Sequence, residues 1–306
     1  MTDVTFRPIT GPDELDLFNR LSYTLNHELA DDLAEGRRQP EWMWLALRDG
    51  RPVARVAWWG RGGEPTPSLL DILDLDEEVP DATGIASALY EKAAAAVLPP
   101  GATPPEYGRY LPPDWHDDPG PVNARMSVLE KAGARLTVER LRLEWQPDAG
   151  VPAADPRLSF RAFADHDELI ALTARALDGT LDAHSRADLA ELSPHDAAVK
   201  HYEEEFATFS SPREWWRVAT VDGEPVGFVI PARNSYHAII AYLGVLPEHR
   251  GKGYVHGILA EGTRVLAEQD VPRVRAATDV GNTPMAAAFA RAGYVNFERA
   301  INMAWN

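Results

Sequence analysis

The stretch "YLGVLPEHRGKGYVHGIL", Tyr242–Leu259, joins an apolar run, a basic glycine-rich loop and an amphipathic segment. The apolar run begins at Ala238 and is bounded by turns, which predicts a buried strand. After the loop, Ile258, Leu259, Val265 and Leu266 recur at helical spacing, which predicts a helix with one apolar face. The stretch therefore indicates a strand, a bare loop and a helix start in that order.

The loop "RGKGYV", residues 250–255, has the chemistry of an anion site. Gly251 and Gly253 let a ligand approach the backbone closely. The first N–H groups of the following helix lack internal partners, and the helix dipole adds partial positive charge there. With Arg250 and Lys252 these groups suit a pyrophosphate. The alternative from the loop alone is a glycine-rich turn with two solvated cations, since short glycine patterns recur by chance.

The two halves of the chain contain an internal sequence repeat. "EWMWLALRDGRPVARV" (Glu41–Val56) and "EWWRVATVDGEPVGFV" (Glu214–Val229) align without gaps, and each predicts a hairpin with an Asp-Gly turn. Two further pairs occur in the same order: "FRPITGPDEL" (6–15) with "FRAFADHDEL" (160–169), and "EKAGARLTVERLRLEW" (130–145) with "ARAGYVNFERAINMAW" (290–305). This order indicates a duplicated domain.

The duplication predicts two α/β domains with mixed sheets, because strands and helices alternate in each half. The proline-, alanine- and aspartate-rich junction "QPDAGVPAADPR" reads as a linker. We expect an N-terminal domain at residues 1–147, a linker at 148–157 and a C-terminal domain at 158–306. After the first long helix, a proline-rich stretch (98–121) stands where the repeat would place a strand.

Composition narrows the classes of function. The formal net charge of −17 disfavours nucleic-acid binding and suits a cationic small molecule, although solubility alone also explains it. The chain has no cysteine, so it lacks disulfides and thiolate metal ligands, and we expect no metal site. No run is long enough for a membrane span, and the N-terminus does not resemble a signal peptide. We expect a cytoplasmic protein with no membrane partner.

A second motif lies about thirty residues after the loop, in "DVGNTPMAAAFARAGY", Asp279–Tyr294. Asn282 suits a helix cap with Pro284 in the first turn, and Gly293 suits the helix end. Together the two motifs resemble those of the GNAT N-acetyltransferase superfamily. Arg250 and Gly253 match two fixed positions of its Arg/Gln-x-x-Gly-x-Gly/Ala loop, whereas Val255 stands where Gly or Ala is usual. Asn282, Phe289 and Gly293-Tyr294 match the second motif.

The resemblance covers the order of elements of the whole second half, and the paired halves resemble tandem GNAT proteins such as mycothiol synthase. It implies a seven-stranded mixed sheet whose fourth and fifth strands splay apart, with acetyl-CoA or another acyl-CoA in the wedge and no metal. The cofactor-binding residues that it implies are Gly244, Val245, Leu246, Arg250, Gly251, Lys252, Gly253, Tyr254, Val255, Asn282 and Phe289.

The catalytic groups of the family are only partly present. Many members use a tyrosine on the last helix to protonate the departing thiolate, but that position is Phe289. The glutamate that some members carry on the fifth strand is Ala277. Tyr294, Tyr242 and water remain as proton donors. Asp279, His237 and Tyr242 remain as bases that take a proton from the amine.

The first half keeps the scaffold without the loop chemistry. At the loop position it has "LDEEVPDATG", residues 75–84, whose four carboxylates would repel a pyrophosphate. Asn123 is one residue out of register with Asn282. We therefore expect a degenerate first domain with a packing role. The leading hypothesis is an acetyl-CoA-dependent N-acetyltransferase that acts on a small-molecule amine in the C-terminal domain. The alternative is a catalytically silent acyl-CoA-binding module. A monomer and a homodimer both remain open.

Overall fold

The computed structural model describes residues 4–305, which form two compact units. Unit 1 consists of residues up to 138 together with those from 300 onward, and unit 2 consists of residues 139–299. Each half of the chain thus gives the end of its last strand to the unit built mainly from the other half. The predicted domain limits describe order along the chain and stay a prediction, whereas these units are defined by contacts.

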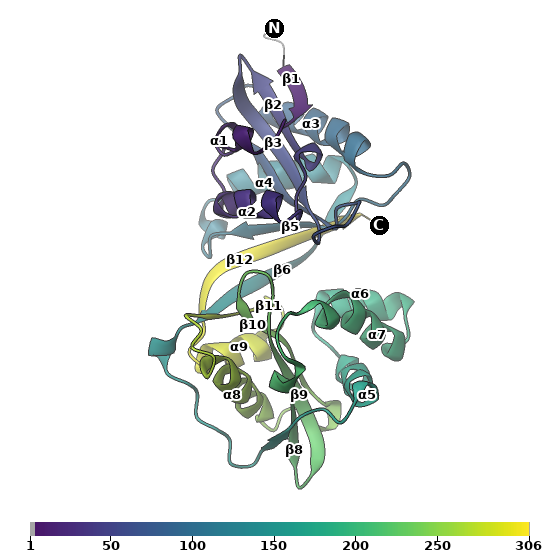
Figure 1. Ribbon diagram of the computed structural model, residues 1–306, viewed down its shortest axis with the longest axis vertical. Coiled ribbons are helices and arrows are strands. Elements are labelled where there is room, and N and C mark those ends of the chain that lie inside the picture. Colours follow the sequence, from purple (N-terminus) through teal and green to yellow (C-terminus); the bar gives the residue numbers. More distant parts are fainter. Residues whose placement is uncertain (1–3, 306) are drawn as a thin grey trace. The chain divides into compact units, whose positions relative to one another are not determined.

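Unit 1 is a mixed sheet covered by helices on both faces (Figure 1). Its sheet order is β1-β2-β3-β4-β5-β12, and the last strand contributes residues from 300 onward. The elements are β1 (Val4–Pro8), α1 (Leu15–Phe18), α2 (Leu29–Ala34), β2 (Met43–Arg48), β3 (Arg51–Trp59), β4 (Leu69–Leu75), α3 (Ala82–Val97), β5 (Tyr107–Leu111), α4 (Gly120–Lys131) and the start of β6 (Ala134–Trp145).

Unit 2 repeats this plan. Its strand order is β12-β6-β11-β10-β9-β8-β7, seven strands as the resemblance implied. The elements are β7 (Ser159–Arg161), α5 (His166–Leu177), α6 (Ala183–Glu191), α7 (Pro194–Glu204), β8 (Arg217–Val221), β9 (Glu224–Arg233), β10 (Ala238–Val245), α8 (Tyr254–Ala267), β11 (Val274–Asp279), α9 (Thr283–Arg291) and β12 (Val295–Trp305).

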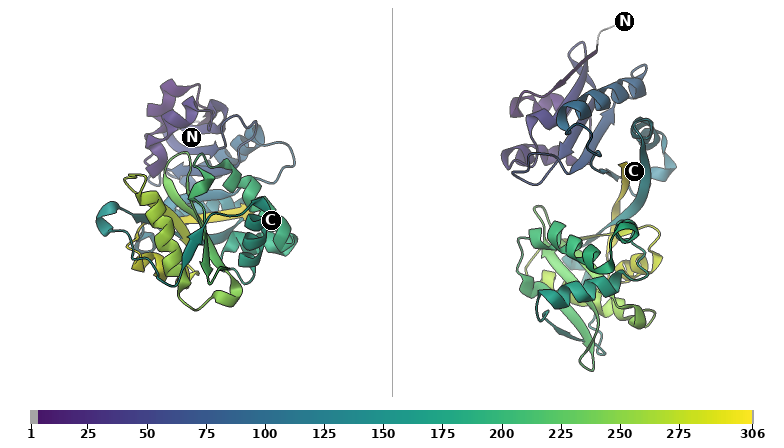
Figure 2. Two further views of the ribbon diagram at one scale, coloured as in Figure 1. Left: turned by 60° about the horizontal axis from the view of Figure 1, so that its bottom comes forward. Right: turned by 90° about the vertical axis from the view of Figure 1, so that its right-hand side faces the viewer.

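The helices of unit 2 cover opposite faces of its sheet. Helices α8 and α9 lie on one face, and α5, α6 and α7 lie on the other (Figures 1 and 2). Under α8 and α9 the core contains Ile258 and Phe289 together with Trp145 from the exchanged β6. The opposite core contains Leu172 and Phe228. The apolar face predicted for the helix after the glycine loop is therefore buried against the sheet, as its spacing indicated.

Both Asp-Gly hairpin predictions are confirmed. Asp49 and Gly50 have φ of 51° and 75°, and Asp222 and Gly223 have φ of 52° and 87°. Two consecutive positive φ values match the tight turn that suits the twist of paired strands, and Asp-Gly is among the pairs that adopt it most easily. The proline-rich stretch differs from the sequence interpretation, which saw it in place of a strand, because "YGRYL" within it forms β5.

Candidate acyl-CoA site

The site begins where two parallel strands part. β10 and β11 pair only at Ala238 with Val274 and at Ile239 with Arg275. Beyond that point β10 stays on β9 and β11 stays on β6, so a wedge opens between them. A register shift between Ile240 and Tyr242 marks a bulge at the start of the wedge, and bulges bend the strand that carries them. The splayed fourth and fifth strands that the resemblance implied are present.

A pocket of about 360 Å³ occupies this wedge. It lies between the strand ends, the glycine loop, the start of α9 and the turn after α5. The predicted residues that line it are Tyr242, Gly244, Val245, Arg250, Gly251, Gly253, Tyr254, Val255 and Asn282. Other lining residues escaped the sequence interpretation, namely Ala176, Gly179, Thr180, Leu181, Leu243, His249, Pro284 and Met285. No local pattern marks the turn after α5, because tertiary packing brings it to the wedge.

The glycine loop has the geometry of an anion cradle. Gly251 and Gly253 have φ of +75° and +79°, a region that other residues adopt only under strain. A Cβ on Gly251 would meet nothing within 4 Å. Within residues 4–305 no backbone carbonyl accepts from the N–H groups of Gly251, Lys252 or Gly253. These donors precede α8, whose first turn adds its own unpaired N–H groups and a positive dipole, so the loop fits a diphosphate.

Arg250 is not aimed at this cradle. Its guanidinium donates to the carbonyl oxygens of Ala176 at 2.8 Å and Asp178 at 2.6 Å, and its Nε donates to Val245 O at 3.1 Å. These carbonyls lie at the C-terminal end of α5 and at the end of β10, where a cation is favourable. Arg250 thus positions the turn after α5 against the loop, which differs from the direct anion contact expected from the sequence.

The second motif caps α9 as predicted. The Asn282 side chain accepts from Met285 N at 3.3 Å, Pro284 lies in the first turn, and Gly293 follows the helix with a φ of +83°. Phe289 is buried in the core, with its ring 5.0 Å from that of Tyr294. Three predicted cofactor residues do not line the pocket. Leu246 and Phe289 are buried in the hydrophobic cores, and the Nζ of Lys252 lies 3.5 Å from His249 Nδ1.

Of the three predicted catalytic residues, Tyr242 alone lines the pocket. Its ring stacks on that of Phe228, with the two centroids 5.5 Å apart. It also packs edge to face with the His201 ring, with those centroids 6.0 Å apart. Burial raises the pKa of Tyr242 well above its usual value, and the nearby charge of Asp182 raises it further. The hydroxyl therefore stays protonated across the working pH range and can donate a hydrogen bond into the wedge.

Asp279 is buried at the end of β11, and both of its oxygens have neighbours. Its Oδ2 accepts from Ala183 N at 2.7 Å, and its Oδ1 lies 3.1 Å from Arg140 Nε. Arg140 also approaches Asp182, with 3.4 Å between Nη2 and Oδ2. The carboxylate thus anchors the start of α6 to the exchanged strand β6. This geometry favours a structural role for Asp279, and the sequence interpretation missed Arg140 because its role depends on the exchange.

The remaining candidates lie away from the pocket. The Tyr294 hydroxyl lies 2.8 Å from Thr263 Oγ1 inside the core, and burial raises its pKa. His237 lies beside the paired end of β10, where its Nε2 is 3.1 Å from Arg275 Nη1. Burial, and then the charge of Arg275, lowers the pKa of His237 to about 4. Neither side chain lines the wedge.

Unit 1 has the same wedge in the same register. β4 and β5 pair only at Leu70 with Tyr107, and β4 carries a register shift opposite Ala57 and Trp58, as β10 does opposite the matching part of β9. In the hairpin alignment Arg55 corresponds to Phe228, and their partners on the next strand are Asp74 and Gly244. An aspartate therefore stands where unit 2 has a pocket-lining glycine.

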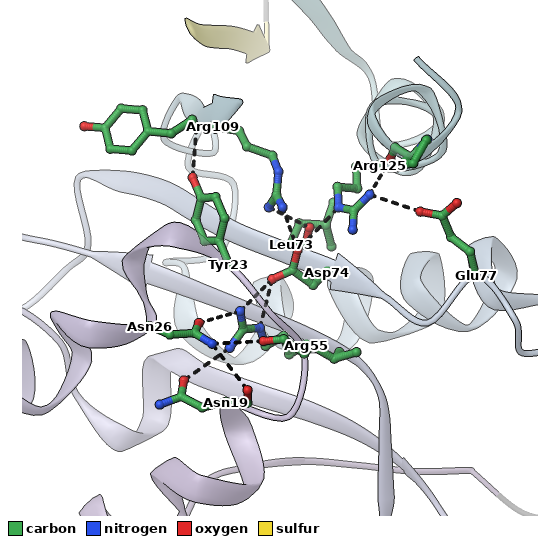
Figure 3. Close-up of polar contacts among 12 residues, drawn as sticks. Asn19, Tyr23, Asn26, Arg55, Leu73, Asp74, Glu77, Arg109 and Arg125 are labelled. Atoms are coloured by element: carbon green, nitrogen blue, oxygen red, sulfur yellow. Dashed lines mark hydrogen bonds and ion pairs between the residues drawn. The ribbon is translucent and has the colours of Figure 1, made fainter. Parts of the chain in front are cut away.

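Asp74 holds three arginines inside the unit 1 wedge (Figure 3). Its oxygens accept from Arg55 Nε at 2.9 Å, Arg109 Nη2 at 2.8 Å and Arg125 Nε at 3.3 Å. Arg109 also crosses from β5 to donate to the carbonyl of Leu73 on β4 at 3.2 Å. Burial alone would raise the pKa of Asp74, but the arginines outweigh it and lower the pKa to about 2. A charged cluster in unit 1 thus stands at the strand position where unit 2 has the pocket-lining Gly244.

Within residues 4–305 no group of three or more histidine, aspartate or glutamate side chains is arranged to hold a metal ion. Over the same residues, no helix is both long and apolar enough to cross a membrane.

Comparison with known proteins agrees with this geometry. The sequence model of the acetyltransferase (GNAT) family matches residues 181–294. A GCN5-related N-acetyltransferase from Sphaerobacter thermophilus superposes with a TM-score of 0.62 at 16% identity, covering 98% of this chain and 94% of its own. A tandem GNAT protein from the clavulanic acid biosynthesis pathway superposes with a TM-score of 0.54 at 19% identity, covering 98% of each chain. A GCN5-related N-acetyltransferase from Kribbella flavida superposes with a TM-score of 0.52 at 17% identity, covering 91% of this chain and 93% of its own.

Residues 181–294 match the acetyltransferase (GNAT) family, and the whole chain has the tandem GNAT fold. Acetyl transfer from acetyl-CoA is the general activity of that family.

Proposed function

We propose that unit 2 transfers an acetyl group from acetyl-CoA to the amine of a small molecule, and that unit 1 does not bind the cofactor. The observation that supports this asymmetry is the contrast between the two wedges. The unit 2 wedge has a pocket and a loop of unpaired N–H groups, whereas Asp74 and its arginines fill the unit 1 wedge. A diphosphate would also meet the carboxylates of Asp76, Glu77 and Glu78 beside the unit 1 wedge.

In this proposal the loop after Arg250 binds the diphosphate, and the pantetheine lies along the open side of β10 near Gly244, Val245 and Leu246. A neutral amine attacks the thioester carbonyl, the C–N bond forms, and the C–S bond breaks. One proton moves from nitrogen to sulfur in the overall exchange. Of the predicted catalytic residues, Tyr242 is the one in the wedge that can donate a hydrogen bond to the departing thiolate.

The pocket lining contains no aspartate or glutamate. A cationic amine therefore loses its first proton to water, to His249 in the lining or to a base outside it. An alkyl amine has a pKa near 10.4, so the reactive fraction should rise about tenfold for each pH unit below that value. We expect the rate at subsaturating amine to increase with pH across the neutral range.

The test is release of free thiol from acetyl-CoA incubated with a panel of small amines, measured beside calorimetric binding of CoA. Release that depends on an amine supports the transferase. Binding without release across a broad panel supports the alternative, a catalytically silent acyl-CoA-binding module. Absence of CoA binding would refute both.

A further inference from the structure

A group of basic side chains surrounds the outer side of the glycine loop in this otherwise acidic chain. Arg157 comes from the segment before β7, where the sequence predicts a linker. Its Nη1 donates to the carbonyl of Lys252 at 3.1 Å, and its guanidinium lies 4.8 Å from the centroid of the Tyr254 ring. A segment outside the portion matched by the family model is therefore fixed against the loop that we assign to the diphosphate.

Two more side chains reach the same point from different helices. A Cβ added to Gly253 would lie 3.9 Å from Arg157 Nη2 and 4.0 Å from His256 Cδ2. On α9, Arg291 brings its Nη1 to 3.2 Å from His256 Nε2. Arg157, His256 and Arg291 thus converge beside Gly253, and we call these three residues the outer basic cluster. None of them lines the wedge pocket.

The position of Arg157 is set by a second contact. Asp155 accepts from its Nε at 2.9 Å and from its Nη2 at 2.6 Å. A Cβ on Gly257 would come within 2.5 Å of the Asp155 Cβ, so the missing side chain lets Asp155 pack on the first turns of α8. Arg157 is therefore held in place and still carries N–H groups beyond those bonded to Asp155 and Lys252, because a guanidinium has five.

Charge around the loop favours an anion. Arg157, Lys252 and Arg291 give three positive charges around the loop, against the negative charges of Asp155 and of Glu248, which is paired with Arg175, in a chain with a net charge of −17. A solvated surface patch would need no such arrangement of Asp155, Tyr254 and Gly257. CoA carries, beside its diphosphate, a second phosphate on the 3′ position of its ribose. Arginine is well suited to such a phosphate, because its planar fork can donate two parallel hydrogen bonds.

We propose that the outer basic cluster binds the 3′-phosphate of CoA, with Arg157 and Arg291 as the residues that read it. This inference rests on the proposed CoA site in unit 2. It makes the protein selective for donors that carry the 3′-phosphate over acetyl-pantetheine donors that lack it. Lys252, whose Nζ lies beside His249 at the pocket, stays with the diphosphate.

The test is calorimetric titration of the full chain with CoA and with 3′-dephospho-CoA. Hydrogen bonds to charged groups predict that the wild type binds dephospho-CoA about 10- to 100-fold more weakly. Arg157→Ala and Arg291→Ala should each weaken CoA binding about tenfold and leave the affinity for dephospho-CoA unchanged. The selectivity for the phosphate should therefore shrink in each variant.

Arg161→Ala is the matched control. Arg161 also pairs with a carboxylate, that of Glu168, and is partly exposed, but it lies on β7 away from the loop. Arg161→Ala should change neither the affinity for CoA nor that for dephospho-CoA. If the arginines acted only through unspecific charge attraction, Arg157→Ala, Arg291→Ala and Arg161→Ala would weaken CoA binding equally. Equal binding of the two ligands by the wild type would overturn the inference, and so would equal weakening of both by Arg157→Ala. Failure of both ligands to bind would instead overturn the proposed function on which the inference rests.

Discussion

Replacing Gly253 by glutamate is the most direct test of the anion cradle. Gly253 has a φ of +79°, stands immediately before α8 and has no atom within 3.9 Å of the position that a Cβ would take. The new side chain thus has room beside Arg157 and His256, and its carboxylate would add a negative charge next to the loop that we assign to the diphosphate. The variant should fold and should lose CoA binding.

The size of the effect follows from two contributions. Holding a residue with a Cβ in the left-handed region costs about 1–2 kcal/mol of folding stability. A carboxylate about 4–6 Å from one phosphate charge costs about 3–4 kcal/mol of binding free energy at an effective dielectric constant near 20. The second contribution corresponds to a fall in CoA affinity of about 100- to 1,000-fold. Backbone strain alone cannot produce a fall of that size.

Calorimetric titration with CoA and urea unfolding of the same samples separate the two contributions. Gly253→Ala should show the strain with a small loss of affinity. Gly223→Glu is the matched control, because Gly223 has a φ of +87°, open space around it and a place in the β8–β9 turn. Gly84, the counterpart of the loop in unit 1, is unsuitable, since its Cβ would lie 2.4 Å from Asp81 Oδ1. Unchanged CoA affinity in folded Gly253→Glu would refute the cradle.

Three further outcomes follow from the structure. Asp74→Asn removes the carboxylate that faces the buried guanidinium groups of Arg55 and Arg109, so urea unfolding at pH 7 should show a loss of about 3–5 kcal/mol. Because the folded pKa of Asp74 is about 2, below its usual 3.8, the difference should shrink as pH falls from about 4 toward 2, where the wild-type carboxyl is also protonated. Arg140→Ala removes the cation beside the buried Asp279, so urea unfolding should show a loss of about 1–3 kcal/mol, while calorimetric titration should find the Kd for CoA unchanged. A chain that starts at residue 148 lacks β6 and should show no cooperative thermal unfolding, whereas one that starts at 134 should retain more structure; equal behaviour would count against the strand exchange.

Most strands and both hairpins could be predicted because their signals are local, whereas β5 was missed because prolines surround it. Alternating apolar runs and Asp-Gly turns depend on neighbouring residues, and the structure places them where the pattern did. The exchange of the last strands could not be predicted. "RLTVERLRLEW" in β6 and "VNFERAINMAW" in β12 are repeats of one another, so either could serve as the last strand of either sheet. Which one does so depends on packing across the whole chain, as with Trp145 in the core of unit 2.

The site divides in the same way. The loop glycines and the Asn282 cap follow from local backbone demands, and their positions could be predicted. The directions in which the side chains point could not be predicted from the sequence. Arg250 turns to the carbonyls at the end of α5, and Asp279 meets Arg140 from a strand more than a hundred residues earlier. Such contacts join segments that are distant along the chain, so residue type alone made these two side chains look available for chemistry.

The two wedges show why a duplicated fold can retain one site and lose the other without losing its architecture. Parted parallel strands leave backbone groups without a strand partner, and buried backbone groups need one. In unit 1 the Arg109 side chain supplies it by donating to the carbonyl of Leu73. The residue of unit 2 that corresponds to Leu73 is Leu243, which lines an open pocket. An internal arginine can therefore stabilise the wedge of unit 1, whereas the wedge of unit 2 keeps its backbone groups for a ligand.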